Sequence, residues 1–346
     1  MPWTKVFLSE DDLHQFKAAD RLRSLSYVEA LREAQKQLLE SDPRVFILGE
    51  GVDDPGGIFG STLGLVDQFG PERVMDIPIA ENGLTGVAVG AAAAGMRPIF
   101  VHMRMDFLPM CMDQIVNHAA KWYYMSGGTV HLPLVIRSLI GRGWGSAAQH
   151  SQALHALFMH IPGLKIAMPS TPYDAKGLLI AAVQDGNPVM FIEHRWIYNS
   201  VGYVPEEQYT VPFGQGVVRK EGRDVTVVAL SQMVYEAAKA ARELEAEGVS
   251  VEVVDPRTLK PLDDELICNS VKKTGRLIIA DVACKTGGVG GEIACRVVEQ
   301  APHWLKAPVR RINFADTPTP SSPVLEEAYY PGSLTIKETI KELLGK

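Results

Sequence analysis

Glu81 is the first candidate for chemistry, because its carboxylate stands in an otherwise apolar stretch. It lies within residues 76–83 (Asp-Ile-Pro-Ile-Ala-Glu-Asn-Gly), and a run of small residues follows over 84–95. Alanine and glycine at that density let a helix pack closely, so we expect the start of this helix to be buried. Burial raises the pKa of a carboxyl group and is costly without a partner. Two interpretations stay open: a proton-exchanging acid, or an acid that stabilises a helix start.

His150 and Phe107 are the next candidates. His150 follows a glycine-rich loop at 141–145, near the carboxyl end of a predicted strand, where open parallel sheets bind ligands. Histidine exchanges protons near neutral pH, although this residue taken alone favours a structural role beside a helix that we expect near Gln149. Phe107 precedes a predicted helix at 113–124 and offers a flat surface for a heteroaromatic ring, or simply a core side chain.

The elements that must position these residues alternate between strands and helices. The segment 198–216 interrupts the alternation with Pro205, Pro212 and several glycines. Alternating elements indicate parallel sheets covered on both faces. We therefore expect an α/β fold with two open, mainly parallel-sheet domains. The expected bounds are an extension at 1–25, domains at 26–200 and 217–346, and a linker at 201–216. The predicted strands are 44–50, 98–101, 132–137, 165–168, 189–193, 224–230, 249–254, 276–281 and 309–313, and the predicted helices are 26–39, 113–124, 174–184, 234–247, 264–272, 291–300 and 333–344.

Composition and motif spacing exclude several classes of function. A net charge of -7 over 346 residues argues against nucleic acid or an anionic membrane as partner. No apolar run is long enough to span a bilayer, and no secretory signal is visible. The four cysteines have no metal-ligand spacing, and the glycine-rich loops lack dinucleotide and phosphate-loop patterns. We expect a cytoplasmic protein with free thiols.

An ordered series of motifs resembles one family, the β subunits of thiamine-diphosphate-dependent 2-oxoacid dehydrogenases. The resemblance begins near Ser26 and covers nearly the whole chain beyond it. It implies a transketolase-like pyrimidine-binding domain followed by a transketolase C-terminal-like domain. The motifs that carry it occupy 76–99, 113–128, 147–152, 162–179, 185–198, 254–276, 288–294 and 307–320.

The resemblance implies a role for each candidate. Glu81 corresponds to the family's glutamate that hydrogen-bonds the aminopyrimidine of thiamine diphosphate and exchanges a proton with it. Phe107 falls where the family stacks an aromatic ring on that pyrimidine. His150 falls on the active-site histidine that assists proton transfer and acyl transfer to lipoyl, and Glu50 matches a glutamate near the cofactor. Some relatives bind a structural potassium ion at the positions of Leu134, Ala182, Asp185 and Asn187.

The resemblance also implies that the chain is half of a cofactor site. Family α subunits carry a Gly-Asp-Gly motif and a later asparagine, which hold magnesium and the diphosphate. The segment 185–187 of this chain (Asp-Gly-Asn) is too short to replace that motif. The expected assembly is an α2β2 heterotetramer that docks on a lipoyl acyltransferase core. The expected reaction is oxidative decarboxylation of a 2-oxoacid, pyruvate first, with acyl transfer to lipoyl-lysine.

One segment departs from the family. Many relatives have glutamate at the position of Val101, and His102 and Arg104 add polarity close to the predicted substrate end. Arg104 is a candidate for binding a second negative charge on the substrate, or for a subunit contact. Two other functions therefore stay open: acetoin cleavage or transketolase-like two-carbon transfer without lipoyl, and a non-catalytic scaffold. Retention of Glu81, Phe107 and His150 argues against the scaffold.

Overall fold

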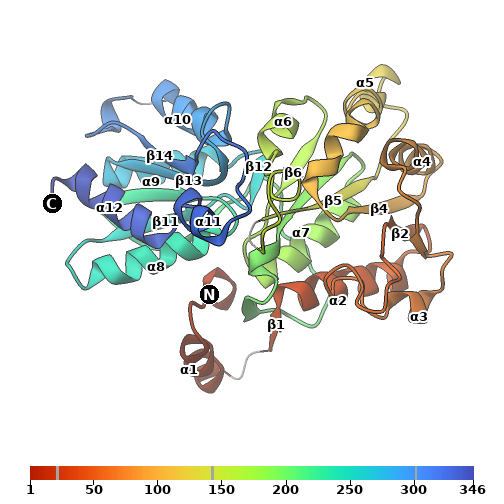
Figure 1. Ribbon diagram of the computed structural model, residues 1–346, viewed down its shortest axis with the longest axis horizontal. Helices are drawn as coiled ribbons and strands as arrows, with labels where there is room; N and C mark the ends of the chain where they lie inside the picture. Colours follow the sequence, from red (N-terminus) through yellow and green to blue (C-terminus); the bar gives the residue numbers. More distant parts are fainter. Residues whose placement is uncertain (21–22, 142–143, 301) are drawn as a thin grey trace.

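The computed structural model describes residues 1–20, 23–141, 144–300 and 302–346 as two α/β bodies side by side (Figure 1). The first contains a seven-stranded sheet of order β12-β6-β7-β5-β4-β2-β3, and the second a five-stranded sheet of order β14-β13-β10-β11-β9. Eight of the ten strand pairings in these two sheets are parallel. The expected α/β class with two mainly parallel sheets is confirmed.

In the seven-stranded sheet, β2, β5 and β7 are buried along their whole length, as expected for the inner strands of a sheet covered on both faces. Its only antiparallel edge among the described residues is β12, which comes from beyond the predicted linker and pairs with β6. The strands are β2 (Val45–Gly49), β3 (Val74–Asp76), β4 (Arg97–His102), β5 (Val135–Ile140), β6 (Lys165–Ala167), β7 (Val189–His194) and β12 (Thr258–Lys260).

Helices cover both faces of this sheet. On one face, α2 (Tyr27–Ser41) packs along α7 (Pro172–Gln184) over a buried apolar cluster. The Ser26 hydroxyl and the Glu29 carboxylate form a capping box that fixes the start of α2. The other face carries a second cluster, which is continuous with the core of the second body. The elements on that face are α4 (Glu81–Ala93), η2 (Met105–Cys111), η3 (Asp113–Ala119), α5 (Trp122–Met125) and α6 (His155–His160), while α3 (Leu65–Phe69) precedes β3 at the sheet edge.

The second body repeats the layered arrangement. Its central strands β10, β11 and β13 are almost entirely buried. The strands are β9 (Val217–Lys220), β10 (Val225–Ala229), β11 (Val251–Asp255), β13 (Leu277–Cys284) and β14 (Arg310–Phe314); the helices are α8 (Met233–Glu245), α9 (Asp264–Thr274), α10 (Val289–Gln300), α11 (Pro323–Tyr329) and α12 (Ser333–Leu344), with short 3₁₀ turns at η4 (Arg195–Ile197) and η5 (Pro302–Trp304).

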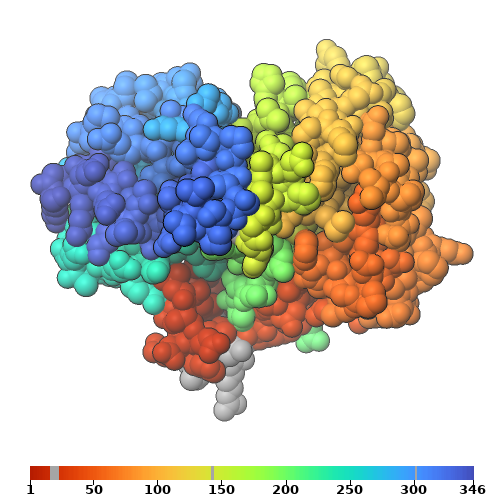
Figure 2. All heavy atoms as spheres, in the orientation of Figure 1, coloured from red at the N-terminus to blue at the C-terminus, as the bar shows by residue number. Residues whose placement is uncertain are grey.

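The N-terminal segment lies beneath the junction of the two bodies (Figure 2, red). It forms η1 (Pro2–Thr4) and α1 (Glu10–Asp20), and β1 (Ser24–Ser26) then pairs antiparallel with β8 (Val201–Tyr203). The Trp3 ring stacks on the Tyr173 ring of α7, with centroids 5.6 Å apart. The backbone carbonyl of Trp3 accepts a hydrogen bond from Arg219 of β9 at 3.1 Å. The segment therefore contacts both bodies at once.

Three local expectations are wrong. The helix expected near Gln149 begins only at His155, and residues 149–154 form an irregular segment before it. The helix expected over 113–124 is divided into η3 and α5. The start of α4 is not buried in the single chain: Ile79 is 81% exposed, and Glu81 is half-buried.

Candidate active site

The candidate site lies where the order of the seven-stranded sheet reverses. From β2 the chain passes outward to β3 and then crosses over to β4 on the other side of β2. Open α/β sheets bind ligands at the carboxyl edge of such a switch point. Glu50 directly follows β2, Glu81 follows β3 and begins α4, and His102 ends β4. The topology therefore brings three predicted site residues to one edge.

A shallow pocket at this edge combines two carboxylates, an imidazole and an aromatic ring. Its lining residues are Glu50, Ile77, Glu81, Phe100, Val101, His102, Met103 and Phe107. Partial burial, together with the neighbouring Glu81 and Asp76 carboxylates, raises the pKa of Glu50. The Asp76 carboxylate accepts a hydrogen bond from the Gly51 amide at 2.6 Å, which holds the loop after β2 against the end of β3. Four predicted site residues thus share one pocket.

Phe107 connects this pocket to His150. The two rings meet at a centroid distance of 5.3 Å and an interplanar angle of 86°, an edge-to-face contact. His150 is exposed and belongs to the irregular segment before α6, whereas Phe107 is half-buried on η2. The Asp106 carboxylate accepts a hydrogen bond from the Gln152 amide at 3.1 Å, and this contact ties the His150 loop to η2.

His102 is a buried side chain with an unused polar atom. It is 4% exposed, its ring packs on Phe100 at 4.2 Å, and its Nε2 has no hydrogen-bond partner among the described residues. Burial lowers the pKa of His102 to about 3, so the imidazole is neutral at pH 7. A buried polar atom without a partner is unfavourable. His102 lines the pocket, so the donor set beside it combines two carboxylates, an aromatic ring and an imidazole nitrogen unpaired among the described residues, the kinds of group that bind an aminopyrimidine.

Arg104 is 9% exposed and makes one long hydrogen bond, from Nη1 to the Gly141 carbonyl at the end of β5, at 3.4 Å. Two of its neighbours were missed by sequence reasoning. Phe59 lies under both Arg104 and Arg195, with guanidinium-to-centroid distances of 5.9 and 4.7 Å. Arg195 follows β7, more than ninety residues from Arg104, so only the strand order brings these residues together.

The residues predicted to bind potassium surround the turn between α7 and β7. The Leu134 carbonyl accepts from the Val189 amide at 2.9 Å, and the Ala182 carbonyl accepts from the Asp185 amide at 3.3 Å. The Asp185 carboxylate pairs with Lys165 and also accepts from the Asn187 amide at 2.9 Å. Among the described residues, no group of three or more His, Cys, Asp or Glu side chains could hold a metal ion. A cation here would depend on backbone oxygens.

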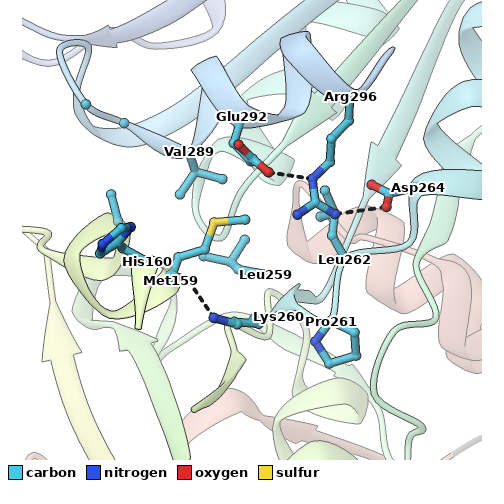
Figure 3. A pocket seen from close by; sticks show the side chains of 13 residues that line it. Met159, His160, Leu259, Lys260, Pro261, Leu262, Asp264, Val289, Glu292 and Arg296 are labelled. Atoms are coloured by element: carbon cyan, nitrogen blue, oxygen red, sulfur yellow. Dashed lines mark hydrogen bonds and ion pairs between the residues drawn. The ribbon is translucent and has the colours of Figure 1, made fainter. Parts of the chain in front are cut away.

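A second pocket lies at the junction of the two bodies, between α6, the β12 segment and α10 (Figure 3). Its cations already have partners. Arg296 pairs with Glu292 and Asp264 at 2.7 and 2.9 Å, and Lys260 donates to the Met159 carbonyl at 2.9 Å. It contains none of the predicted site residues.

Two family descriptions match consecutive parts of the chain. Residues 23–200 match the transketolase pyrimidine-binding domain, and residues 214–336 match the transketolase C-terminal domain. The chain is 44% identical to the β subunit of acetoin:2,6-dichlorophenolindophenol oxidoreductase from Bacillus subtilis, with 94% of this chain and 98% of the relative covered. It is 43% identical to the pyruvate dehydrogenase E1 component subunit β of Rickettsia bellii, over 91% and 97%. The chain belongs to the E1 β-subunit family of the 2-oxoacid dehydrogenases.

E1 β subunits are oxidoreductase components, and the family is associated with thiamine diphosphate. A third relative, the 2-oxoisovalerate dehydrogenase subunit β of Bacillus subtilis, is 43% identical over 92% of this chain and 98% of its own length. Because these three relatives differ in named substrate, the family does not fix the 2-oxoacid. The fold resembles a solved split-gene transketolase in an inactive β4 tetramer, with a TM-score of 0.75 and 26% identity over 93% and 98% of the two chains. Within the described residues, no helix is long and apolar enough to cross a membrane.

Proposed function

We propose that this E1 β subunit holds the pyrimidine end of thiamine diphosphate at the edge formed by β2, β3 and β4, and that it decarboxylates a 2-oxoacid together with an α subunit. The observation that carries the proposal is the single pocket shared by Glu50, Glu81, His102 and Phe107, with His150 against Phe107. When bound, the cofactor supplies a carbanion that attacks the 2-oxo carbon and accepts electrons on loss of carbon dioxide.

Each side chain has a distinct task. The Glu81 carboxyl exchanges a proton with the pyrimidine ring. Beside it, partial burial and the Glu81 and Asp76 carboxylates raise the pKa of Glu50. Phe107 presents a flat face that orients the ring. The exposed imidazole of His150 delivers protons at the mouth of the site, where the substrate and an incoming lipoyl group arrive.

An α subunit is proposed to complete the site. The elements that supply pocket residues also carry exposed apolar side chains: Ile79 at 81% just before α4, Val87 at 57% on α4 and Met110 at 52% on η2. Exposed apolar residues grouped beside a site favour a partner contact. In the proposed α2β2 heterotetramer, the partner supplies magnesium and the diphosphate contacts, and a lipoyl acyltransferase core receives the acyl group. Backbone oxygens near Leu134, Ala182, Asp185 and Asn187 are proposed to bind potassium.

Co-expression with the α subunit tests this function. The complex is assayed for decarboxylation of pyruvate, 2-oxobutyrate and 2-oxoisovalerate, once with a lipoyl domain and once with an artificial electron acceptor. Turnover with both is expected. If the complex binds thiamine diphosphate but turns over none of the 2-oxoacids with the lipoyl domain or with the artificial acceptor, the proposal is refuted.

A second candidate is acetoin cleavage without a 2-oxoacid. It is favoured by the 44% identity to acetoin:2,6-dichlorophenolindophenol oxidoreductase β subunits from both Bacillus subtilis and Cupriavidus necator. The same complex assayed with acetoin and dichlorophenolindophenol distinguishes the two functions. Activity with acetoin and none with any 2-oxoacid would select this second candidate.

A further inference from the structure

Arg104 and Arg195 form a cationic pair whose charge the described residues leave largely uncompensated. Both guanidinium groups lie over the ring of Phe59, at 5.9 and 4.7 Å from its centroid. Arg195 also lies 5.5 Å from the Trp144 ring and 5.0 Å from the Tyr198 ring. Aromatic faces stabilise a guanidinium, but they do not neutralise it.

No described carboxylate forms an ion pair with either arginine, in contrast to Arg137 and Arg219, which are both fully buried and paired with acids. Burial, together with the Arg195 charge, lowers the pKa of Arg104, while the Asp106 charge opposes this effect from beyond contact distance. One oxygen of the Asp106 carboxylate accepts from the Gln152 amide, and the other contacts neither arginine as an ion pair among the described residues. A buried cation without a contacting anion is costly, so the site is suited to receiving one.

The position of the pair relates it to the substrate. Along the carboxyl edge of the sheet, the acids Glu81 and Glu50 follow β3 and β2, whereas the cations Arg104 and Arg195 follow β4 and β7. Arg104 lies between His102 and Phe107 in sequence, and it donates to the end of β5, from which the chain continues toward His150. The acidic end suits a proton-exchanging pyrimidine. The cationic end begins at the next strand, β4, extends to β7, and suits an anion.

We propose that Arg104 and Arg195 bind a second anionic group of the substrate, a carboxylate or a phosphate, at the end remote from the reacting 2-oxo group. The inference rests on the proposed function and names its substrate class: a dianionic 2-oxoacid. Arginine suits this task because its planar fork donates two parallel hydrogen bonds to a carboxylate or phosphate. Pyruvate and 2-oxoisovalerate, which appear in the names of relatives, carry no second anionic group for such a site to bind.

The test uses the purified complex of this chain with its α subunit. Isothermal titration with glutarate and with inorganic phosphate measures binding of the remote group without turnover, and tighter binding of one of them identifies carboxylate or phosphate as that group. In parallel, kcat/KM is compared for 2-oxoglutarate, a phosphorylated 2-oxoacid and the monoanion 2-oxobutyrate. Arg104→Met removes the buried charge, and Arg195→Gln removes the half-buried one. Arg44→Gln is the matched control, because Arg44 precedes β2 at the opposite edge of the sheet and its loss changes the net charge equally.

We expect the wild-type complex to prefer a dianionic substrate and to bind its remote group. Either active-site variant should lower the ratio of dianion to monoanion kcat/KM by about 10- to 100-fold, the effect of losing a charge-assisted hydrogen bond, and the control should not change that ratio. The inference is overturned if neither anion binds the wild-type complex, or if both variants lower activity equally with every substrate. Arg104-dependent binding of glutarate or phosphate in a complex that turns over no 2-oxoacid would support the anion site and refute the proposed function.

Discussion

The ring of His150 meets the ring of Phe107 edge to face, with centroids 5.3 Å apart and planes at 86°. The two residues come from different segments, a loop before α6 and the helix η2, and the hydrogen bond from the Gln152 amide to Asp106 joins those segments. One side chain can therefore orient a ring while its neighbour moves protons beside it. Substitutions at the two positions should affect different measured quantities.

Phe107→Leu should weaken thiamine diphosphate binding while changing turnover at saturating cofactor much less. Loss of a stacking surface costs about 0.5–1.5 kcal/mol beyond the lost area, or a rise in Kd of roughly 2- to 13-fold. Titration of the assembled complex with cofactor measures the change. Phe107→Tyr keeps the stacking surface and is the control; if Leu and Tyr bind the cofactor equally well, Phe107 is only a core residue.

His150→Gln should show the opposite pattern. The exposed imidazole supplies a proton carrier, and removal of a general acid–base group lowers kcat by about 10²- to 10⁴-fold. The Kd of the cofactor should stay close to the wild-type value, because the Phe107 face remains. Stopped-flow measurement of decarboxylation and of transfer to a lipoyl domain locates the affected step. Equal loss of cofactor affinity and of kcat would instead indicate a structural role for His150.

The buried imidazole of His102 should make the protein acid-sensitive. Because its pKa falls from 6.5 to about 3 on folding, only the unfolded state binds the proton between those pH values. Stability from this group is present above pH 6.5 and is lost as the pH falls, by on the order of 2 kcal/mol between pH 7 and pH 5. Urea denaturation of wild type and His102→Phe at the two pH values measures this. His102→Phe keeps the packing on Phe100 and should lose less unfolding free energy between pH 7 and pH 5 than wild type. An identical loss in both proteins would contradict the lowered pKa of His102.

Arg219 should be essential for the junction of the two bodies. Its guanidinium pairs with Asp174 of α7 and with Asp255 at the end of β11, and it donates to the Trp3 carbonyl at 3.1 Å. Burial alone would raise the pKa of Asp174, but the charges of Arg219 and Arg257 outweigh it and hold that pKa low. Arg219→Met leaves buried carboxylates underpaired, which costs about 3–5 kcal/mol. Thermal denaturation should show this loss and only a small effect for Lys220→Met, which removes a half-buried cation paired with the exposed Glu245. An equally small effect of Arg219→Met would show that the buried network is dispensable.

Sequence reasoning was most successful where chemistry lies in contiguous motifs. Glu50 and His102 stand at the ends of predicted strands, Glu81 begins the expected small-residue helix, and Phe107 precedes a predicted helix. The structure places all four in one pocket. The fold class followed for the same reason, since buried parallel strands are nearly continuous apolar runs. The assigned roles of these residues and the predicted domain bounds stay predictions.

What the sequence did not reveal depends on strand order and backbone geometry. Phe59, Arg104 and Arg195 lie far apart in the chain and meet only because β4, β5 and β7 are adjacent. The edge strand β12 follows the predicted linker but pairs antiparallel with β6 in the first sheet. No local sequence pattern predicts this pairing. Trp144 and Ala147 adopt left-handed backbone, which non-glycine residues rarely do, so the loop between β5 and α6 does not follow from residue type.

The central claim is that Glu81 exchanges a proton with the pyrimidine of thiamine diphosphate. The most direct measurement is the rate of hydrogen–deuterium exchange at the thiazolium carbon of the cofactor bound to the αβ complex, followed by NMR after acid quench. Glu81→Gln keeps the shape of the side chain and removes its exchangeable acid. We predict that exchange slows by about 10²- to 10⁴-fold in this variant while the cofactor still binds. Exchange at the wild-type rate in cofactor-loaded Glu81→Gln would contradict the account.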